Sequence, residues 1–253
     1  MSQLEVGAQT IPWGENIRAA MENILRFLRS EGYAGVETGV RHFDTKRPDY
    51  YRDLYRQLGL VPLGLHSGGQ FWEPGAAQRE RAKLLDSARF AAAVGFRHLV
   101  VSGNRDETPE SMSEAARTYA SIGGQCRDLG LRFAYHNHNW ELADNARILE
   151  VLLQSTRPEE VSLVLDVAWV HLAGMALRPL LDRFGDRVAY IHLKDAAGDR
   201  FCELGTGEVA LDETLRLIQD AAIPWIVIEQ DYTTLTAEES MRINRSFLRT
   251  RGL

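Results

Sequence analysis

The feature of this sequence that most constrains its fold is a repeated alternation between short apolar segments and longer amphipathic segments, which continues along the whole chain. This alternation is typical of βα units arranged around a parallel sheet. Eight segments have the length and the β-branched or apolar composition of strands that cross a barrel wall. They are residues 4–9, 35–38, 60–66, 98–102, 132–136, 161–166, 188–192 and 225–229.

Helical periodicity fills the intervals between these segments, because apolar residues recur there at three- and four-residue spacing. The length of 253 residues is about that of one (β/α)₈ barrel. No Pro/Gly/Ser-rich linker or abrupt charge shift divides the chain. We therefore predict one (β/α)₈ TIM barrel domain over residues 1–253. The helical patterns include residues 16–29, 78–92, 109–129, 178–184 and 237–248.

Composition and charge exclude several classes of function. The formal net charge of −6 argues against a protein that binds nucleic acid by neutralising phosphates. No apolar run reaches the roughly 18 residues that a membrane span needs, and the N-terminal residues lack the features of a signal peptide. Cys126 and Cys202 have no second thiol at metal or redox spacing. We expect a cytoplasmic protein with neither nucleic acid nor a membrane as partner.

The last four predicted strands each end on or just before a side chain that can bind a metal. In a (β/α)₈ barrel, the C-terminal ends of the strands and the loops after them form the active face. A single Asp in such a place is as readily the cap of the next helix. Four carboxylate and imidazole groups on consecutive strands instead predict one divalent metal site. Its expected ligands are Glu141, Asp166, His192 and Glu229.

Other polar and aromatic residues lie near these strand ends. His136 and His138 point the same way in a strand, and position 136 is better placed to face the barrel interior. Trp169 forms either part of the core or a wall against which a sugar ring stacks. Lys194 either lies on the same side of its strand as His192 or is a surface cation. Glu37 and His66 lie at the ends of earlier strands, where each either contacts a substrate hydroxyl or makes a structural contact. The residues expected to contact substrate are His136, His138, Trp169, His171 and Lys194.

Four segments, YHNHNWEL, LVLDVAWVHLAG, YIHLKD and WIVIEQD, resemble the xylose-isomerase-like barrel superfamily, particularly its sugar phosphate isomerase/epimerase proteins. The resemblance spans nearly the whole chain. It implies a Mn²⁺, Co²⁺, Mg²⁺ or Zn²⁺ ion bound by Glu, Asp, His and Glu from the last four strands, with both glutamates also moving protons. Asp166, His192 and Glu229 match the last three ligands.

The first ligand of that set departs from the family pattern. Many relatives have Glu at the position of His136, whereas this chain places Glu141 five residues later. His136, Glu141 or both would then bind the metal. We expect Glu141 to be ligand and proton carrier, with His136 beside it.

The resemblance implies a sugar isomerase or epimerase that acts on a ketose or keto-sugar through an enediolate, with Glu141 and Glu229 as acid and base. The alternative is a dehydratase, lyase or keto-glycoside-cleaving enzyme at the same site, in which His136, His138 or His171 assists the leaving group. A non-catalytic sugar-binding barrel is a third hypothesis. The expected partner is a small sugar or polyol, and the resemblance also suggests a homo-oligomer.

Overall fold

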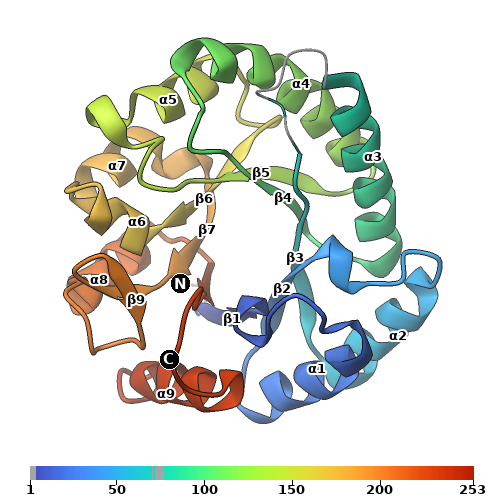
Figure 1. Cartoon of the computed structure of the whole chain (residues 1–253), viewed down its shortest axis with the longest axis vertical. Helices are drawn as coiled ribbons and strands as arrows, with labels where there is room; N and C mark the ends of the chain where they lie inside the picture. The colour runs from blue at the N-terminus through green and yellow to red at the C-terminus, as the bar shows by residue number, and fades with distance from the viewer. Residues whose placement is uncertain (1–3, 70, 72–76) are drawn as a thin grey trace.

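The computed structural model describes residues 4–69, 71 and 77–253. Eight parallel strands form a closed barrel in the order β1-β10-β7-β6-β5-β4-β3-β2 (Figure 1). The prediction of a TIM barrel is confirmed, and every predicted strand is present within two residues at either end. The strands are β1 (Glu5–Gln9), β2 (Gly35–Gly39), β3 (Val61–His66), β4 (His98–Ser102), β5 (Arg132–His136), β6 (Ser162–Asp166), β7 (Val188–Leu193) and β10 (Trp225–Ile228).

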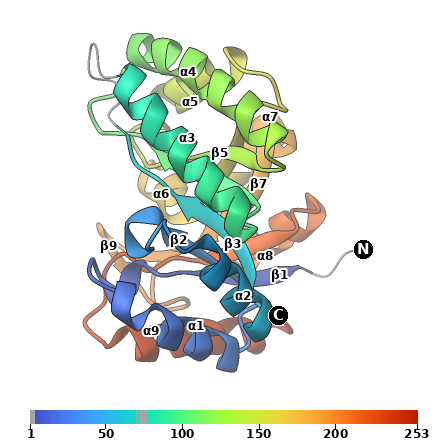
Figure 2. The same cartoon turned by 90° about the vertical axis from the view of Figure 1, so that its right-hand side faces the viewer.

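Helices surround the barrel on its outer side (Figures 1 and 2). Short 3₁₀ turns occur at Ile11–Trp13, Arg18–Ala20, Val40–His42 and Gly185–Arg187, so the helix expected from residue 16 begins only at Met21. No helix in the described ranges is long and apolar enough to cross a membrane. The helices are α1 (Met21–Ser30), α2 (Pro48–Leu58), α3 (Ala77–Val94), α4 (Pro109–Asp128), α5 (Ala143–Gln154), α6 (Val167–Leu172), α7 (Leu177–Phe184), α8 (Leu211–Asp220) and α9 (Ala237–Arg249).

Local sequence signals explain where two of the helices begin. Thr108 caps α4 by accepting the Ser111 backbone N–H, and the Ser111 side chain accepts the Thr108 N–H in return. Thr236 and Glu239 form the same reciprocal pair at α9. Each pair satisfies two backbone groups that a helix start or its cap leaves unpaired.

A short antiparallel hairpin, β8 (Asp195–Ala197) with β9 (Arg200–Cys202), interrupts the βα repeat between β7 and α8. The sequence did not predict it. Asp195 organises the loop that follows, because its buried carboxylate accepts the backbone N–H groups of Gly205, Gly207 and Val209 at 2.9–3.1 Å. The hairpin therefore belongs to the C-terminal ends of the strands.

Strand alternation divides the buried side chains into two sets. One set fills the barrel interior and the larger one packs between strands and helices. In β5, Ala134 belongs to the inner set, whereas Phe133 and Tyr135 belong to the outer one. Because side chains alternate along a strand, His136 faces the barrel mouth and Tyr135 lies behind the barrel wall. The inner set is Leu63, Val100, Ala134, Val164, Tyr190, Trp225 and Val227, and Ala189, next to Tyr190, packs against the same cluster.

Candidate metal centre at the barrel mouth

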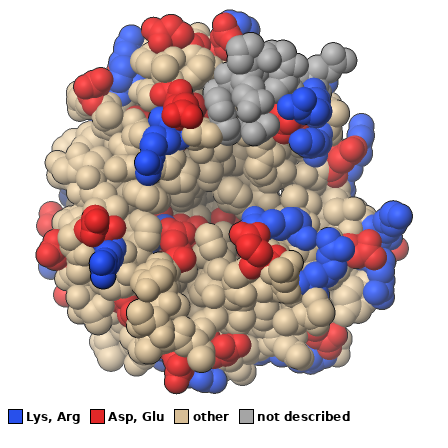
Figure 3. Space-filling model, viewed as in Figure 1, with Lys and Arg blue, Asp and Glu red and all other residues tan. Residues whose placement is uncertain are grey.

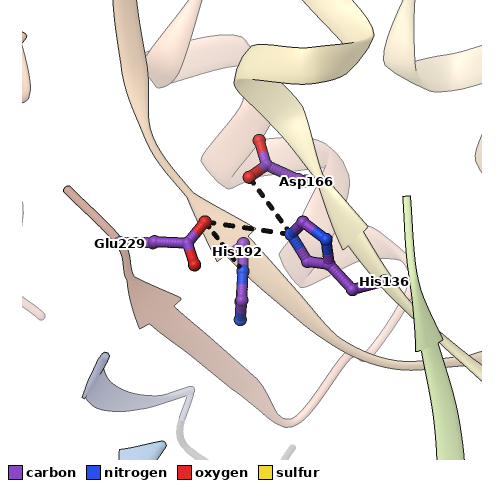
Figure 4. Close-up of side chains that lie close together, drawn as sticks. All are labelled: His136, Asp166, His192 and Glu229. Atoms are coloured by element: carbon purple, nitrogen blue, oxygen red, sulfur yellow. Dashed lines mark ion pairs between the residues drawn. The ribbon is translucent and has the colours of Figure 1, made fainter. Parts of the chain in front are cut away.

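Four side chains from neighbouring strand ends meet inside the barrel mouth (Figure 4). The strands β5, β6, β7 and β10 are neighbours in that order around the barrel wall. Their C-terminal ends carry His136, Asp166, His192 and Glu229 respectively. One nitrogen or oxygen of each residue lies within 4.8 Å of those of the other three, and all four residues are buried. The His136 Nε2 atom is 3.5 Å from Asp166 Oδ2 and 3.8 Å from Glu229 Oε2.

The chemistry of this group suits a divalent cation. His136 Nε2, Asp166 Oδ2 and His192 Nδ1 are buried and have no hydrogen bond of regular geometry within the described chain, although each lies within ion-pair distance of a neighbouring side chain. Buried polar atoms without a partner are uncommon and destabilising. Three of them converge here, and together with Glu229 they supply two imidazole nitrogens and two carboxylates, which is a donor set for Zn²⁺ or a similar ion.

Outer contacts orient the two histidines. His192 Nε2 lies 3.0 Å from Glu37 Oε2, which leaves Nδ1 facing the group. His136 Nδ1 lies 3.3 Å from Ser102 Oγ, and this hydroxyl is 2.9 Å from His66 Nε2. A partner on the far nitrogen sets the tautomer and the orientation of a ligating imidazole. Glu37 is fully buried and also accepts a hydrogen bond from the Tyr190 hydroxyl. Of the two roles considered for it, the structural contact therefore fits and the contact with a substrate hydroxyl does not.

Lys194 lies among the carboxylates of the site. Its Nζ atom is 2.9 Å from Asp166 Oδ2, 2.5 Å from Glu229 Oε2 and 2.6 Å from Asp231 Oδ2. Burial alone would lower the pKa of Lys194, but the three carboxylates raise it well above its usual value. Burial would raise the pKa of Asp166 and of Glu229, but the charge of the Lys194 ammonium group lowers both below their usual values. Lys194 is therefore a buried counter-charge, and the surface-cation alternative is wrong.

A cavity of about 460 Å³ opens above the four-residue group. The face shown in Figure 3 is hollowed near its centre, with acidic and basic side chains around the rim. One wall is aromatic, since the Trp169 ring lies 5.0 Å from Phe201 and 5.8 Å from Trp140. Flat apolar rings with polar groups beneath them suit a polyhydroxylated ring. The other lining residues include Gln9, Arg41, His42, His66, Ser102 and Asp231.

The residues expected to contact substrate are distributed unevenly around this cavity. His136, His138 and Trp169 line it. Lys194 is fully buried and does not line it, but contacts two residues that do, Glu229 and Asp231. His171 does not line it. This side chain borders a separate hollow of about 180 Å³ beside α7 and α8, with Nε2 3.9 Å from Glu208 Oε2. His171 lies on α6, five residues beyond Asp166.

The structure does not bring Glu141 into the four-residue group, contrary to our expectation. Its carboxylate is fully buried, Oε2 accepts the His138 backbone N–H at 2.7 Å, and Oε1 lies 2.9 Å from the Tyr135 hydroxyl. The chain turns after β5, so this side chain lies behind His138 and away from the cavity. His136, the alternative for this position, stands in the group instead.

Sequence reasoning missed several residues of the site. Ser102 and Asp231 had a usable signal, because one ends a predicted strand and the other lies two residues beyond Glu229. Phe201 had none, since it lies in the unexpected hairpin. Glu107, which meets Tyr135 behind the wall, lies in a loop whose position the sequence does not fix.

Residues 11–251 match the family described as xylose isomerase-like TIM barrel. This chain belongs to that family. It is 32% identical over 225 residues to the inosose dehydratase of Geobacillus kaustophilus, an alignment that covers 79% of this chain and 71% of the relative. The family is one of enzymes, and the expected resemblance is confirmed.

Two solved structures show the same fold at low sequence identity. A sugar phosphate isomerase/epimerase from Parabacteroides distasonis superposes with a TM-score of 0.82 at 19% identity, covering 98% of this chain and 94% of the other. The IolI protein with a bound zinc atom gives a TM-score of 0.83 at 15% identity, covering 98% and 97%. At these identities the likeness shows the fold alone.

Proposed function

We propose that this protein is a divalent-metal-dependent dehydratase that removes water from an inosose or a similar cyclic keto-polyol. The observation that carries the proposal is the group of His136, Asp166, His192 and Glu229 at the floor of the cavity, in a chain 32% identical to an inosose dehydratase. From the sequence we expected an isomerase or epimerase, with a dehydratase as the alternative. The relatives favour the second.

The four residues of the group would hold the ion, with His136 in place of Glu141 as the ligand from β5. Bound there, a divalent ion supplies a Lewis acid that polarises a ketone and makes the neighbouring C–H more acidic. Mn²⁺, Co²⁺, Mg²⁺ and Zn²⁺ are the candidates. The Lys194 ammonium group lies within 3 Å of two of the ligand carboxylates and would compensate negative charge that develops on the substrate oxygen.

The distribution of acid and base groups favours elimination over epimerisation. Epimerisation at one carbon needs a proton carrier on each side of the substrate. Of the two glutamates expected to fill these roles, only Glu229 lines the cavity. Another part of the wall presents the His138 imidazole, which stacks on Trp140 at 4.1 Å. One carboxylate and one imidazole suit removal of a proton and protonation of a leaving hydroxyl.

In this mechanism, Glu229 takes the proton from the carbon beside the ketone. The C–O bond on the next carbon then breaks, and His138 gives a proton to the departing hydroxyl, which leaves as water. The electrons of the broken C–H bond form the new C=C bond of the enol or enone product. Trp140 and Trp169 would hold the ring of the substrate against the cavity wall and keep bulk water from it.

The test is direct. Chelator-treated protein is reloaded separately with each of the four ions and incubated with an inosose in D₂O, and the reaction is followed by NMR. The proposal predicts net loss of the inosose and a product one water lighter, only with a metal present. Deuterium exchange with formation of an isomer would instead support the isomerase hypothesis, and no turnover with any ion would refute both.

A further inference from the structure

A second cluster of buried polar groups lies behind the barrel wall, at the ends of β4 and β5, and the mechanism above does not use it. The Tyr135 hydroxyl lies 2.6 Å from Glu107 Oε2 and 2.9 Å from Glu141 Oε1. Glu107 is 6% exposed, and Glu141 and Tyr135 are 0% exposed. Two carboxyl groups thus share one hydroxyl out of contact with water.

The number of protons in this cluster follows from its contacts. A tyrosine hydroxyl has one proton to donate, so a second short contact to an oxygen requires a protonated carboxyl that donates to the hydroxyl. Burial, with a smaller contribution from the charge of Glu141, raises the pKa of Glu107 to about 7. Glu107 is therefore the carboxyl that holds the proton. With the proton on Glu107, Tyr135 accepts from Glu107 and donates its own proton to Glu141 Oε1.

Glycine at position 103 makes room for this arrangement. A Cβ atom there would lie 1.8 Å from the Tyr135 hydroxyl oxygen, 2.4 Å from Glu107 Oε2 and 2.5 Å from Glu141 Oε1. All three contacts are too close for any side chain to be accommodated without moving the cluster. The chain after β4 thus lies directly against all three functional groups.

Glu141 connects the cluster to the cavity through His138. One oxygen accepts the His138 backbone N–H at 2.7 Å, and the other lies 3.4 Å from Nδ1 of the same residue. The ring is further fixed by stacking on Trp140 at 4.1 Å and by an edge contact with Trp169 at 5.4 Å. With Nδ1 turned to Glu141, Nε2 is the ring nitrogen left for the cavity.

We propose that Glu141 is a positioning residue, not a metal ligand, and that the Glu107–Tyr135–Glu141 chain holds His138 as its Nδ1–H tautomer with Nε2 available to substrate. The role of His138 in turnover rests on the proposed function, but the tautomer does not. A carboxylate behind an imidazole sets which nitrogen carries the proton. Glu141, which lies outside the four-residue metal group, thus has a role of its own.

Two isosteric variants separate this role from a merely structural one. Glu107→Gln keeps a donor to Tyr135, because an amide N–H replaces the carboxyl O–H. Glu141→Gln leaves one acceptor oxygen where Glu141 faces three donors. With that oxygen kept on the His138 backbone N–H, which makes the shortest contact, the amide NH₂ faces Nδ1 of His138, and Nδ1 loses its acceptor. Both changes alter the same cluster, and neither removes a side-chain atom other than hydrogen, since Gln replaces one carboxyl oxygen by nitrogen. Glu114→Gln, on the exposed side of α4, is the control.

The first readout is the ¹⁵N NMR signature of the His138 ring in ¹⁵N-histidine-labelled, Zn²⁺-loaded protein, assigned with His138→Gln. Wild type, Glu107→Gln and Glu114→Gln should show the Nδ1–H tautomer, and Glu141→Gln should shift toward Nε2–H. The second readout is bound metal by elemental analysis. The metal content of Glu107→Gln, Glu141→Gln and Glu114→Gln should equal that of wild type.

The third readout is turnover. Glu141→Gln should lower kcat by roughly 10²-fold with KM changed less than twofold, within the range for a mispositioned general acid, while Glu107→Gln stays within a few-fold of wild type. Loss of metal from Glu141→Gln, or an unchanged His138 tautomer in it, would overturn the inference. Because tautomer and metal are measured without substrate, a wild type that dehydrates nothing would refute the proposed function and leave this inference standing.

Discussion

Side chains at the end of β5 point in different directions, and direction decides what each can contact. His136 faces into the barrel and joins Asp166 and Glu229, whereas Tyr135 lies behind the wall against Glu107. His138, just beyond the strand, lines the cavity. Residues that are adjacent in sequence thus belong to the metal group, the buried cluster and the substrate wall.

Two histidines provide a matched test of the cavity assignment. His138→Ala should lower kcat by roughly 10²–10⁴-fold, because it removes the imidazole that protonates the leaving hydroxyl. His171→Ala should change kcat less than threefold, because His171 borders a different hollow. Steady-state kinetics of metal-loaded protein checks both. Comparable losses in the two variants would mean that the cavity is not where the reaction occurs.

The raised pKa of Glu107 predicts a particular dependence of stability on pH. Its folded-state pKa of about 7 lies above the ordinary 4.5, so between these values the folded protein binds more protons than the unfolded chain, and stability falls as pH rises through that window. The full effect is on the order of 3 kcal/mol. Glu107→Gln should flatten this fall.

Urea unfolding at pH 5.5 and at pH 8.5 measures that effect. The variant should be more stable than wild type at pH 8.5 and closer to it at pH 5.5. Glu114→Gln, an exposed substitution in the same region, should leave the pH dependence of wild type unchanged. Parallel pH profiles for wild type and Glu107→Gln would show that Glu107 does not carry the proton.

Sequence alone predicted three of the four members of the metal group. Asp166 and His192 lie within their strands and Glu229 immediately follows one, so the geometry of a parallel barrel places them together. Glu141 lies in a loop five residues beyond β5, and nothing in its local sequence shows that the loop turns behind the wall. The choice between His136 and Glu141 therefore needed the structure.

At the scale of the elements, two adjacent glycines in α4 face different surroundings. A methyl group at Gly123 would lie 1.8 Å from the backbone oxygen of Glu160, in the chain that leads to β6, whereas Gly124 has nothing within 4 Å. Gly123 thus allows α4 to approach this segment closely. Gly124 only weakens the helix, because glycine is a poor helix former.

Alanine substitutions at these positions should have opposite signs. Gly124→Ala should raise the free energy of unfolding by about 0.5–1 kcal/mol through helix propensity and reduced freedom of the unfolded chain. Gly123→Ala should lower it by roughly 1–3 kcal/mol, because the backbone must move to avoid the overlap. Chemical denaturation of each variant measures the difference. Equal effects would contradict the close packing of α4 against Glu160.

The regular elements followed from periodicity more closely than the irregular ones. Strands and long helices repeat a pattern that burial imposes, so their positions were predicted within a few residues, apart from the late start of α1. The β8–β9 hairpin has only three residues in each strand, which is too short for a period to emerge. Its loop is held by a single buried carboxylate, Asp195, and no periodicity in the sequence predicts such a contact.

For the whole molecule, the barrel mouth concentrates charge that a bound ion would balance. Asp166, Glu229 and Asp231 surround one Lys194 ammonium group, in a chain of net charge −6. A metal that binds the folded chain at 1,000 times its Kd stabilises it by about 4 kcal/mol. The melting temperature should therefore rise by on the order of 10 °C on metal loading.

Calorimetry of chelator-treated protein, with and without each divalent ion, checks this rise. His136→Ala should abolish most of it, because it removes one ligand. His171→Ala, which leaves the four-residue group intact, should retain the full rise. A wild-type melting temperature that no ion changes would remove the metal from the proposal. The expected homo-oligomer stays a prediction, which sedimentation can measure on the same samples.

The two oxygens of Asp166 have different partners, and this has a consequence beyond metal binding. Oδ2 faces the metal group, while Oδ1 accepts the backbone N–H groups of Ala168 and Trp169 at the start of α6. A rigid carboxylate cannot rotate toward an ion without tilting that helix start. The indole of Trp169 should thus report occupancy of the site, as a change in intrinsic fluorescence that needs no substrate.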